Sequence, residues 1–255
     1  MCGRFAAFSS ATAIADQLAI QVISAGARLL PPSWNVAPTN EIALIANADA
    51  IQMQLPDPLA EGYPNTNTKQ LELTTARWGL MPQWSKPPKG RSSGIINARA
   101  ESVAQKRPFK DAFNKRRCLV PVDGYYEWQK LQAGHTKKQP WYFTNSDGTL
   151  MLFAGIFDVT SDGLSVAITT MPANETMAPI HHRMPTVLSA ADIDTWLYAD
   201  AETAERLILT APQHLTRAKV SSRVNSVANN GPSLISEISD PISEMINNRA
   251  ELTLF

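Results

Sequence analysis

Arg117-Cys-Leu-Val-Pro-Val-Asp-Gly-Tyr-Tyr-Glu-Trp128 is a strongly apolar stretch in the middle of this 255-residue chain. Branched and aromatic residues are enriched in β-strands, so we expect a strand over 118–128. Similar stretches predict further strands over residues 41–48, 51–55, 71–80, 141–143, 150–159 and 164–170. In the segment 51–55 the apolar residues alternate with polar ones, which is typical of a half-buried strand.

Fewer helices are expected than strands. The spacing of Ile14, Leu18 and Val22 predicts one amphipathic helix from Ser9 to about Ile23. A capping-box pattern predicts a second helix that ends at 198, and a third is expected over about 202–209. The residues 34–39 follow a Pro-Pro pair and are expected to form an irregular loop.

This succession of elements predicts an α+β fold. We expect one domain over 1–230, with a curved, mostly antiparallel, barrel-like sheet and peripheral helices. A C-terminal tail over 231–255 is expected to pack on that domain. The segment 51–75 has the character of an insertion. Neither this segment nor the tail after residue 230 contains a motif that indicates a function.

Composition narrows the class of protein. The chain has only two cysteines, Cys2 and Cys118, with no paired spacing, which argues against a disulfide framework or a zinc site. No apolar run reaches the roughly 18–20 residues that cross a bilayer, and no signal peptide is visible. We therefore expect a cytoplasmic protein, nucleoid-associated if it is bacterial, with no membrane contact, no metal and no cofactor. We also expect a monomer.

The distribution of charge is uneven although the formal net charge is zero. A basic run between 86 and 117 is opposed only by Glu101 and Asp111, and it contains Lys86, Lys89, Arg91, Arg99, Lys106, Arg107, Lys110, Lys115, Arg116 and Arg117. A local basic field suits a phosphate backbone. Taken alone, such a run is more often a solvated charged face.

The N-terminus begins Met1-Cys2-Gly3-Arg4-Phe5. Removal of Met1 would leave Cys2 with an α-amine and a thiol on adjacent carbons, with pKa values near ~8 and ~8.5. Such an aminothiol traps an aldehyde, because the amine forms an imine and the thiol then closes a thiazolidine ring. The alternative is an incidental cysteine near the start of the chain.

Three further segments contain residues suited to catalysis or binding. His181 and His182 are adjacent, and on an extended segment only one of them would face a given site. Glu127 stands among aromatics, where desolvation would raise its pKa for acid–base work. Structural histidines and a solvent-facing glutamate are the alternatives. Asn97 can hydrogen-bond a sugar and Arg99 can grip a phosphate, unless this segment merely starts a helix.

The order of these motifs resembles the SOS response-associated peptidase (SRAP) family, of the abasic-site-processing type. The resemblance rests on Met1–Phe5, Trp34-Asn-Val-Ala-Pro-Thr39, Arg77-Trp-Gly-Leu-Met-Pro-Gln-Trp84, Asn97-Ala-Arg-Ala-Glu101, Arg117–Trp128, His181-His-Arg-Met-Pro185 and Val220-Ser-Ser-Arg-Val-Asn225. It implies that the protein senses abasic sites in single-stranded DNA, including single-strand/double-strand junctions, during the DNA damage response. It also implies a covalent thiazolidine crosslink through Cys2 after Met1 is removed.

The resemblance assigns roles to individual positions. The catalytic set is Cys2, Asn97, Glu127 and His181, with His182 at the variable position of its motif. Arg99 and Arg107 would bind phosphates, with Arg4 and Arg117 as weaker candidates, whereas Trp84 and Pro38 would support bases at the junction. Asn35 and Thr170 complete the implied DNA-binding set, and Trp78 is expected in the core.

Two other functions remain open at this point. A cysteine peptidase could use Cys2, His181 and Asn97 on external proteins, and removal of Met1 by autoproteolysis is consistent with it. A reader of modified bases without covalent chemistry would leave Cys2 dispensable. A tag ahead of Cys2 separates the first two, because the peptidase would survive it and the crosslinking protein would not.

Overall fold

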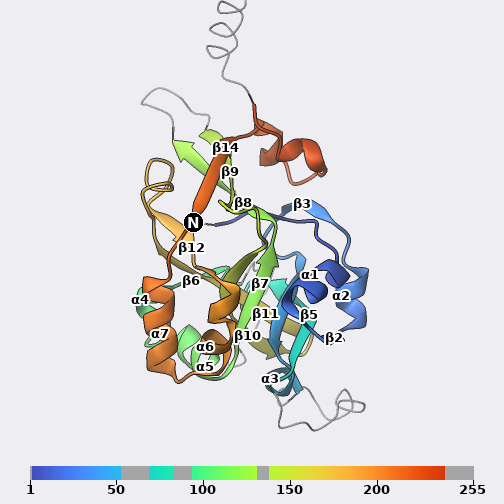
Figure 1. The fold of residues 1–255 in the computed structure, drawn as a ribbon, viewed down its shortest axis with the longest axis vertical. Coiled ribbons are helices and arrows are strands. Elements are labelled where there is room, and N and C mark those ends of the chain that lie inside the picture. Colours follow the sequence, from blue (N-terminus) through green and yellow to red (C-terminus); the bar gives the residue numbers. More distant parts are fainter. Residues whose placement is uncertain (1, 53–68, 83–93, 131–137, 239–255) are drawn as a thin grey trace, which may run out of the picture.

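The stretch that we expected to form one strand crosses between two sheets. The computed structural model describes residues 2–52, 69–82, 94–130 and 138–238. In it, β7 (Arg117–Val122) belongs to a nine-stranded sheet and β8 (Gly124–Lys130) to a five-stranded sheet (Figure 1). The backbone N–H of Asp123, between the two strands, donates to the carbonyl of Ala6 at 2.9 Å. A Cβ at Gly124 would lie 2.4 Å from the Tyr142 ring, so the close strand approach there requires glycine.

The smaller sheet holds the N-terminal strand. Each pair of neighbouring strands in this sheet is antiparallel. Its order is β14 (Leu215–Lys219), β9 (Lys138–Asn145), β8, β1 (Phe5–Ala7) and β3 (Ser33–Val36). The strand β1 therefore lies inside the sheet, between two partners, and the residues just before it are held by the same ladder.

The larger sheet curves until it closes on itself. Its order is β12 (Arg183–Pro185), β11 (Gly163–Pro172), β10 (Met151–Thr160), β7, β4 (Glu41–Asn47), β5 (Leu71–Trp78) and β2 (Val22–Ile23), with β13 (Val187–Leu188) on β10 and β6 (Asn97–Arg99) on β11. An additional parallel pairing joins β11 to β5 and completes a barrel. Two other pairs, β11–β6 and β2–β5, are parallel, and the remaining pairs are antiparallel.

Strand alternation sorts the core into two layers. In β10, Phe153 joins a cluster inside the barrel, whereas Leu152 faces a second cluster beneath the helices. In β4, Leu44 and Ile45 divide between the same two layers. Because both faces of these strands are buried, their sequences are continuous apolar runs rather than alternating apolar and polar residues. Trp78 is fully buried, as expected.

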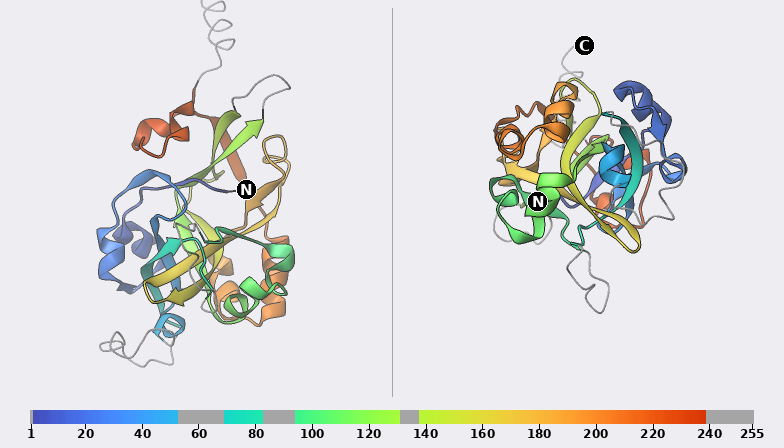
Figure 2. Two further views of the ribbon diagram at one scale, coloured as in Figure 1. Left: turned by 180° about the vertical axis from the view of Figure 1, so that it is seen from behind. Right: turned by 90° about the horizontal axis from the view of Figure 1, so that it is seen from below.

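The helices surround the barrel. They are α1 (Ala11–Leu18), α2 (Ala25–Leu29), α3 (Ala48–Gln52), α4 (Ala100–Val103), α5 (Arg107–Lys115), α6 (Ile193–Tyr198) and α7 (Ala201–Thr210), with short 3-10 turns η2 (Ala190–Asp192), η3 (Ser222–Asn225) and η4 (Pro232–Leu234). Figure 2 shows α1 and α2 on one side, and the green and orange helices on the other. The expected α+β domain with a curved, mostly antiparallel sheet is confirmed. None of the described helices is long and apolar enough to cross a membrane.

Two local predictions at the N-terminal side are wrong. The helix expected up to Ile23 ends at Leu18, because Ala19 adopts a left-handed conformation with φ 52°. The next residues pair with β5 as β2 instead. The loop expected over 34–39 begins as β3, because pairing with β1 outweighs the breaking effect of the flanking prolines.

A third local prediction is also wrong. The expected strand over 51–55 starts within α3 as far as the structure describes it. The Asn47 side chain accepts a hydrogen bond from the backbone N–H of Asp49 at 2.7 Å. Such a local side-chain bond favours a helical turn over a continued strand. The residues 53–55 lie outside the described part of the chain.

The helices expected near the C-terminal end are present. The Ser189 and Asp192 capping box exists and precedes α6, and α7 covers the segment expected over about 202–209. Beyond them, Leu234 of the segment expected as a tail is buried in a cluster with Ala6 and Tyr126. The residues 239–255 lie outside the described part.

Asn35 fastens the C-terminal motif to the N-terminal strands. Its amide nitrogen lies 3.3, 2.9 and 2.8 Å from the carbonyl oxygens of Val224, Ser226 and Asn229. Its Oδ1 accepts from Arg4 Nη1 at 2.7 Å. Because the side chain is buried, its loss would leave several buried polar groups without hydrogen-bond partners.

We therefore predict that Asn35→Ala lowers the free energy of unfolding by about 2–4 kcal/mol in urea denaturation. Asn40→Ala is the matched control, since the exposed Asn40 side chain accepts one bond from the Ala37 N–H. Its expected cost is about 0.5–1 kcal/mol. Equal losses in the two variants would contradict the fastening role of Asn35.

Candidate functional site

Cys2 is drawn into the interior by the strand that follows it. Phe5 is fully buried, and its ring centroid lies 4.9 Å from that of Trp78 and 6.4 Å from that of Phe153. The Arg4 carbonyl accepts from the Tyr126 N–H at 3.0 Å, which continues the ladder toward the N-terminus. Cys2 itself is fully buried and belongs to the cluster inside the barrel.

Asn97 makes a direct contact with this cysteine. Its amide nitrogen donates to the Cys2 carbonyl oxygen at 2.8 Å. Asn97 is placed by β6, which pairs parallel with β11 in the register Asn97 to Ile168. The other side-chain atom, Oδ1, is buried with no hydrogen-bond partner among the described residues. The amide therefore fixes Cys2 and keeps an acceptor in the same interior space.

Glu127 approaches the same cysteine from β8. The carboxylate is buried, with 6% of the residue exposed, and Oε1 accepts from the Trp128 N–H at 3.2 Å. It lies close enough to Cys2 and Tyr125 for its charge to raise the pKa of both groups. The alternative of a solvent-facing edge glutamate therefore does not describe this side chain.

The Cys2 thiol is held in its neutral form. Burial raises its pKa well above the ordinary value, and the Glu127 charge raises it further. The hydrogen bond from the Arg4 backbone N–H lowers the pKa but does not cancel these effects. Cys118, also buried, has a raised pKa for the same first reason. A buried neutral thiol is a poor nucleophile until a base takes its proton.

The histidine pair differs from our expectation. The ring centroids of His181 and His182 lie 4.3 Å apart at 31°, so the two side chains lie together rather than on opposite faces. The reason is that the pair precedes β12 in an irregular segment that bends at His182 rather than in an extended strand. His181 Nδ1 lies 3.0 Å from the backbone nitrogen and 3.1 Å from the carbonyl oxygen of Arg183, so the Arg183 backbone holds the ring through this atom.

The electrostatics of the pair are set mainly by the two rings acting on each other. The pKa of the exposed His182 is lowered chiefly by His181, and desolvation, Arg183 and Arg99 lower it further. Positive neighbours disfavour a second positive charge on the ring. Arg99, two residues after Asn97 on β6, is thus among the charges that act on the histidine pair.

Two residues of this arrangement were missed by the sequence reasoning. Arg183 is buried, and its guanidinium pairs with both carboxylate oxygens of Glu101, from Nη2 to Oε2 at 2.9 Å. Nη2 also donates to the Thr170 carbonyl at 2.5 Å. The ion pair lowers the pKa of Glu101. It links α4, β11 and β12, and so fixes the turn that carries His181. The sequence did contain a signal for this pair, because Glu101 lies in the motif 97–101 and Arg183 in the motif 181–185.

The candidate phosphate-binding residues divide into exposed and buried groups. Arg99 and Arg107 are exposed, at the end of β6 and the start of α5, and Pro38 is half-buried. Trp84 lies outside the described residues. Arg4 is partly buried and, besides its bond to Asn35, donates to the Val224 carbonyl at 2.9 Å.

Arg117, Asn35 and Thr170 have structural partners. The buried Arg117 guanidinium donates to the carbonyls of Trp196, at 2.5 Å, of Phe113, at 3.0 Å, and of Ala199. Because these bonds use the guanidinium edge inside the protein, we leave Arg117 out of the proposed DNA contacts. Asn35 and the fully buried Thr170 are left out for the same physical reason.

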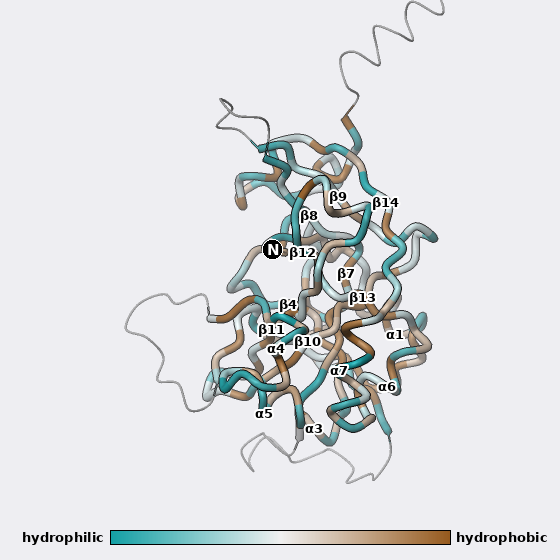
Figure 3. The backbone as a smooth tube through the Cα atoms, turned by 90° about the vertical axis from the view of Figure 1, so that its left-hand side faces the viewer, coloured by the Kyte–Doolittle hydropathy of each residue, from teal (hydrophilic) through white to brown (hydrophobic). Residues whose placement is uncertain are grey.

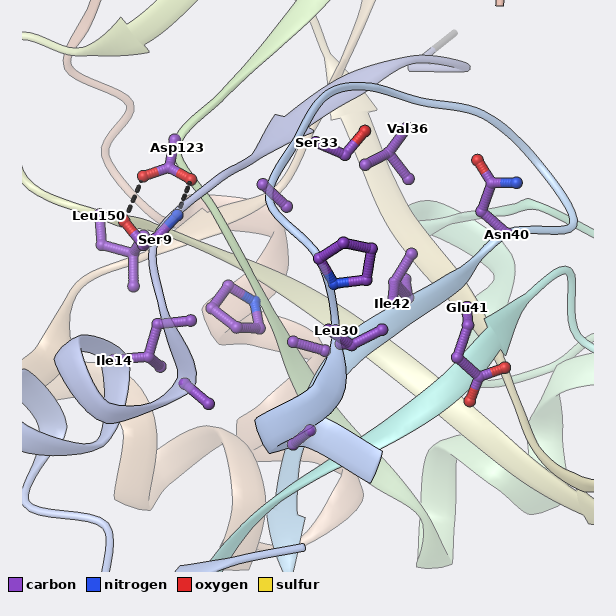
Figure 4. A pocket seen from close by; sticks show the side chains of 16 residues that line it. Ser9, Ile14, Leu30, Ser33, Val36, Asn40, Glu41, Ile42, Asp123 and Leu150 are labelled. Carbon is purple, nitrogen blue, oxygen red and sulfur yellow. Dashed lines mark hydrogen bonds between the residues drawn. The ribbon is translucent and has the colours of Figure 1, made fainter. Parts of the chain in front are cut away.

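A separate cavity of about 310 Å³ lies between α1, α2 and the ends of β1, β3 and β4 (Figure 4). Its walls are mostly apolar, and one wall is fixed by Ser9, whose N–H donates to Asp123 Oδ2 at 2.9 Å. None of the candidate site residues lines it. Within the described part of the chain, no group of three or more His, Cys, Asp or Glu side chains could hold a metal ion.

The protein is therefore a barrel whose candidate site surrounds Cys2, the second residue of the chain. A cysteine, an amide and a carboxylate converge there from separate motifs, and the exposed Arg99 follows the amide on the same strand. A family model described as SOS response associated peptidase (SRAP) matches residues 1–227. The chain belongs to this family.

Individual relatives agree with this assignment. Abasic site processing protein YoqW of Bacillus subtilis (strain 168) is 35% identical over 250 residues, covering 92% of this chain and 99% of that protein. Abasic site processing protein HMCES of Pongo abelii is 29% identical over 244 residues, covering 81% and 65%. A crystal structure of a protein from Bacteroides thetaiotaomicron has a TM-score of 0.75 at 20% identity, covering 93% and 100%, and supports the fold.

The raised thiol pKa leads to a prediction about reactivity. In the native protein at about pH 7.5, Cys2 and Cys118 should resist alkylation by iodoacetamide, because little thiolate forms below a raised pKa. Both should react rapidly in denaturant, where the pKa returns to about 8.5. Mass spectrometry after timed alkylation measures this. Modification of native Cys2 at the rate of a free cysteine peptide would contradict the description.

Proposed function

We propose that the protein traps abasic sites in single-stranded DNA by forming a thiazolidine between Cys2 and the opened deoxyribose, and thereby shields the lesion. The observation that carries this proposal is the 2.8 Å hydrogen bond from Asn97 to the carbonyl of Cys2, which fixes Cys2 inside the barrel. The relatives are named for abasic site processing, which supports the same class of substrate. Action as a soluble cytoplasmic monomer belongs to the proposal.

The first step is removal of Met1. Hydrolysis of the Met1–Cys2 peptide bond consumes one water and releases methionine, by self-cleavage or through an aminopeptidase. Before that step the Cys2 nitrogen is an amide and cannot form an imine. After it, Asn97 still holds the Cys2 carbonyl and so orients the new α-amine.

The second step joins the amine to the sugar. The abasic deoxyribose opens to an aldehyde at C1′, and the Cys2 amine adds to this carbon. Loss of one water then gives an imine. His181, with Nδ1 engaged by the Arg183 backbone, presents Nε2 as the group that moves a proton during ring opening. The buried Oδ1 of Asn97 is an acceptor suited to a sugar hydroxyl.

The third step closes the ring. The thiol sulfur bonds to C1′ as the imine double bond opens, and the thiol proton passes to the nitrogen. Glu127, whose charge acts on the thiol, is the base that carries this proton. A thiazolidine has no C=N bond for water to attack, so the adduct outlasts the imine. The same change removes the acidity of the C2′ protons that would lead to strand cleavage.

The electrostatics favour this order of events over a peptidase mechanism. A cysteine peptidase requires a thiolate before it meets its substrate, which normally needs a lowered pKa. Here burial raises the thiol pKa. In the proposed sequence the thiol meets an imine already bonded to its own residue, and proximity compensates for the small thiolate fraction.

Cys2→Ala should lose the durable crosslink. The variant keeps an N-terminal amine, so it can form an imine, but no thiol can close the ring. On a denaturing gel after heating, wild-type protein with abasic single-stranded oligonucleotide should show a covalent band that Cys2→Ala lacks. A durable band of equal intensity in both proteins would overturn the mechanism.

Arg99→Ala should weaken DNA binding and its dependence on salt. Each phosphate contact with single-stranded DNA contributes about 0.7 to the slope of log K against log salt, so the slope should become shallower by about that amount. Arg28→Ala is the control, because Arg28 is exposed on α2, on the side of the molecule away from α4. An unaltered slope in Arg99→Ala, measured by fluorescence anisotropy, would count against a phosphate contact.

A further inference from the structure

A row of side chains crosses the smaller sheet from the candidate active site to its edge. Glu127 on β8 is directly opposite Trp141 on β9, and Trp141 is directly opposite Lys219 on β14. Directly opposed residues of antiparallel strands share one face of the sheet. Trp141 therefore lies between Glu127 at the candidate site and Lys219 at the edge of the sheet.

Two cationic side chains lie over the ring of Trp141. The Arg217 guanidinium carbon lies 5.1 Å and the Lys219 ammonium nitrogen 5.6 Å from the Trp141 ring centroid. Arg217 and Lys219 are two residues apart on β14, so they share its face. Such contacts hold a cation in place while leaving its charge intact. Among the described residues, the exposed Arg217 makes no ion pair.

The same row contacts the segment that leads to His181. The Trp141 Nε1–H donates to Gln129 Oε1 at 3.0 Å, and Gln129 Nε2 donates to the Pro179 carbonyl at 3.1 Å. Arg217 Nη1 donates to the Thr176 carbonyl at 2.5 Å. The cations thus lie beside the chain that carries the histidine, on the strands drawn above the N-terminus in Figure 1. Figure 3 shows hydrophilic colouring prevailing along these strands.

We propose that Arg217 and Lys219 bind backbone phosphates of the single strand that flanks the lesion, on a path that leaves the Cys2 site across Trp141. This inference rests on the proposed function and extends its DNA contacts beyond Arg99 and Arg107. Trp141 acts as a fixed platform for the two cations, since its N–H is already used by Gln129. A flank of sufficient length should therefore bind more tightly than a short one.

The test uses two oligonucleotides with a non-reactive tetrahydrofuran abasic analogue, one with flanks of about three nucleotides and one with flanks of about ten, since single-strand sites span several nucleotides. Wild-type protein should bind the long form more tightly. The double variant Arg217→Gln/Lys219→Gln should bring the long-to-short affinity ratio toward one. It should also reduce the salt slope on the long form by about 1.4. Arg217→Lys should retain most of the ratio, and Arg28→Gln should retain all of it.

Two outcomes would overturn the inference. One is an unchanged long-to-short ratio in the double variant. The other is an equal loss on both lengths, together with slower crosslinking at saturating DNA, which would assign these side chains to holding the segment before His181. Covalent trapping by wild-type protein is measured separately on a reactive abasic oligonucleotide. Its absence, with the flank effect present, would refute the proposed function while leaving this path intact.

Discussion

The structure depends on the pairing of β1 on both of its edges. Because this strand lies between β8 and β3, the first residues of the chain are held in the interior rather than left to fray. The fully buried Phe5 and the Arg4 ladder bond then deliver Cys2 to the inside of the barrel. Residues 2–5 are therefore held by strand pairing and burial.

Burial gives that terminus its chemical character. A thiol on the surface would react with many electrophiles, whereas the buried Cys2 thiol has a raised pKa and stays protonated. In the proposed mechanism, selectivity for an aldehyde would follow from the order of steps, since the amine bonds to the carbon first. The Arg183–Glu101 ion pair supports the same site at a distance, because it joins the segment of Asn97 to the segment of His181.

Sequence patterns predicted the strand-rich class and several elements, and the physical reasons for the misses are specific. The stretch 117–128 was recognised as buried β-structure, but nothing in its apolar pattern showed that it changes sheets at Asp123. The expected strand at 51–55 and the overlong first helix failed because the Asn47 side-chain bond and the left-handed Ala19 act locally. The convergence of Cys2, Asn97 and Glu127 depends on long-range pairing, which motif order indicated only through family resemblance. The partners of Arg117 are backbone carbonyls, and sequence patterns do not reveal such partners.

The most direct test of the account is the intact mass of the protein after incubation with an abasic single-stranded oligonucleotide and without a reducing agent. The account predicts a species with the mass of the chain lacking Met1, plus the oligonucleotide, minus one water. An undamaged oligonucleotide of the same sequence should give no such species. An adduct that retains Met1, or no adduct on the abasic strand, would contradict the central role of the Cys2 amine and thiol.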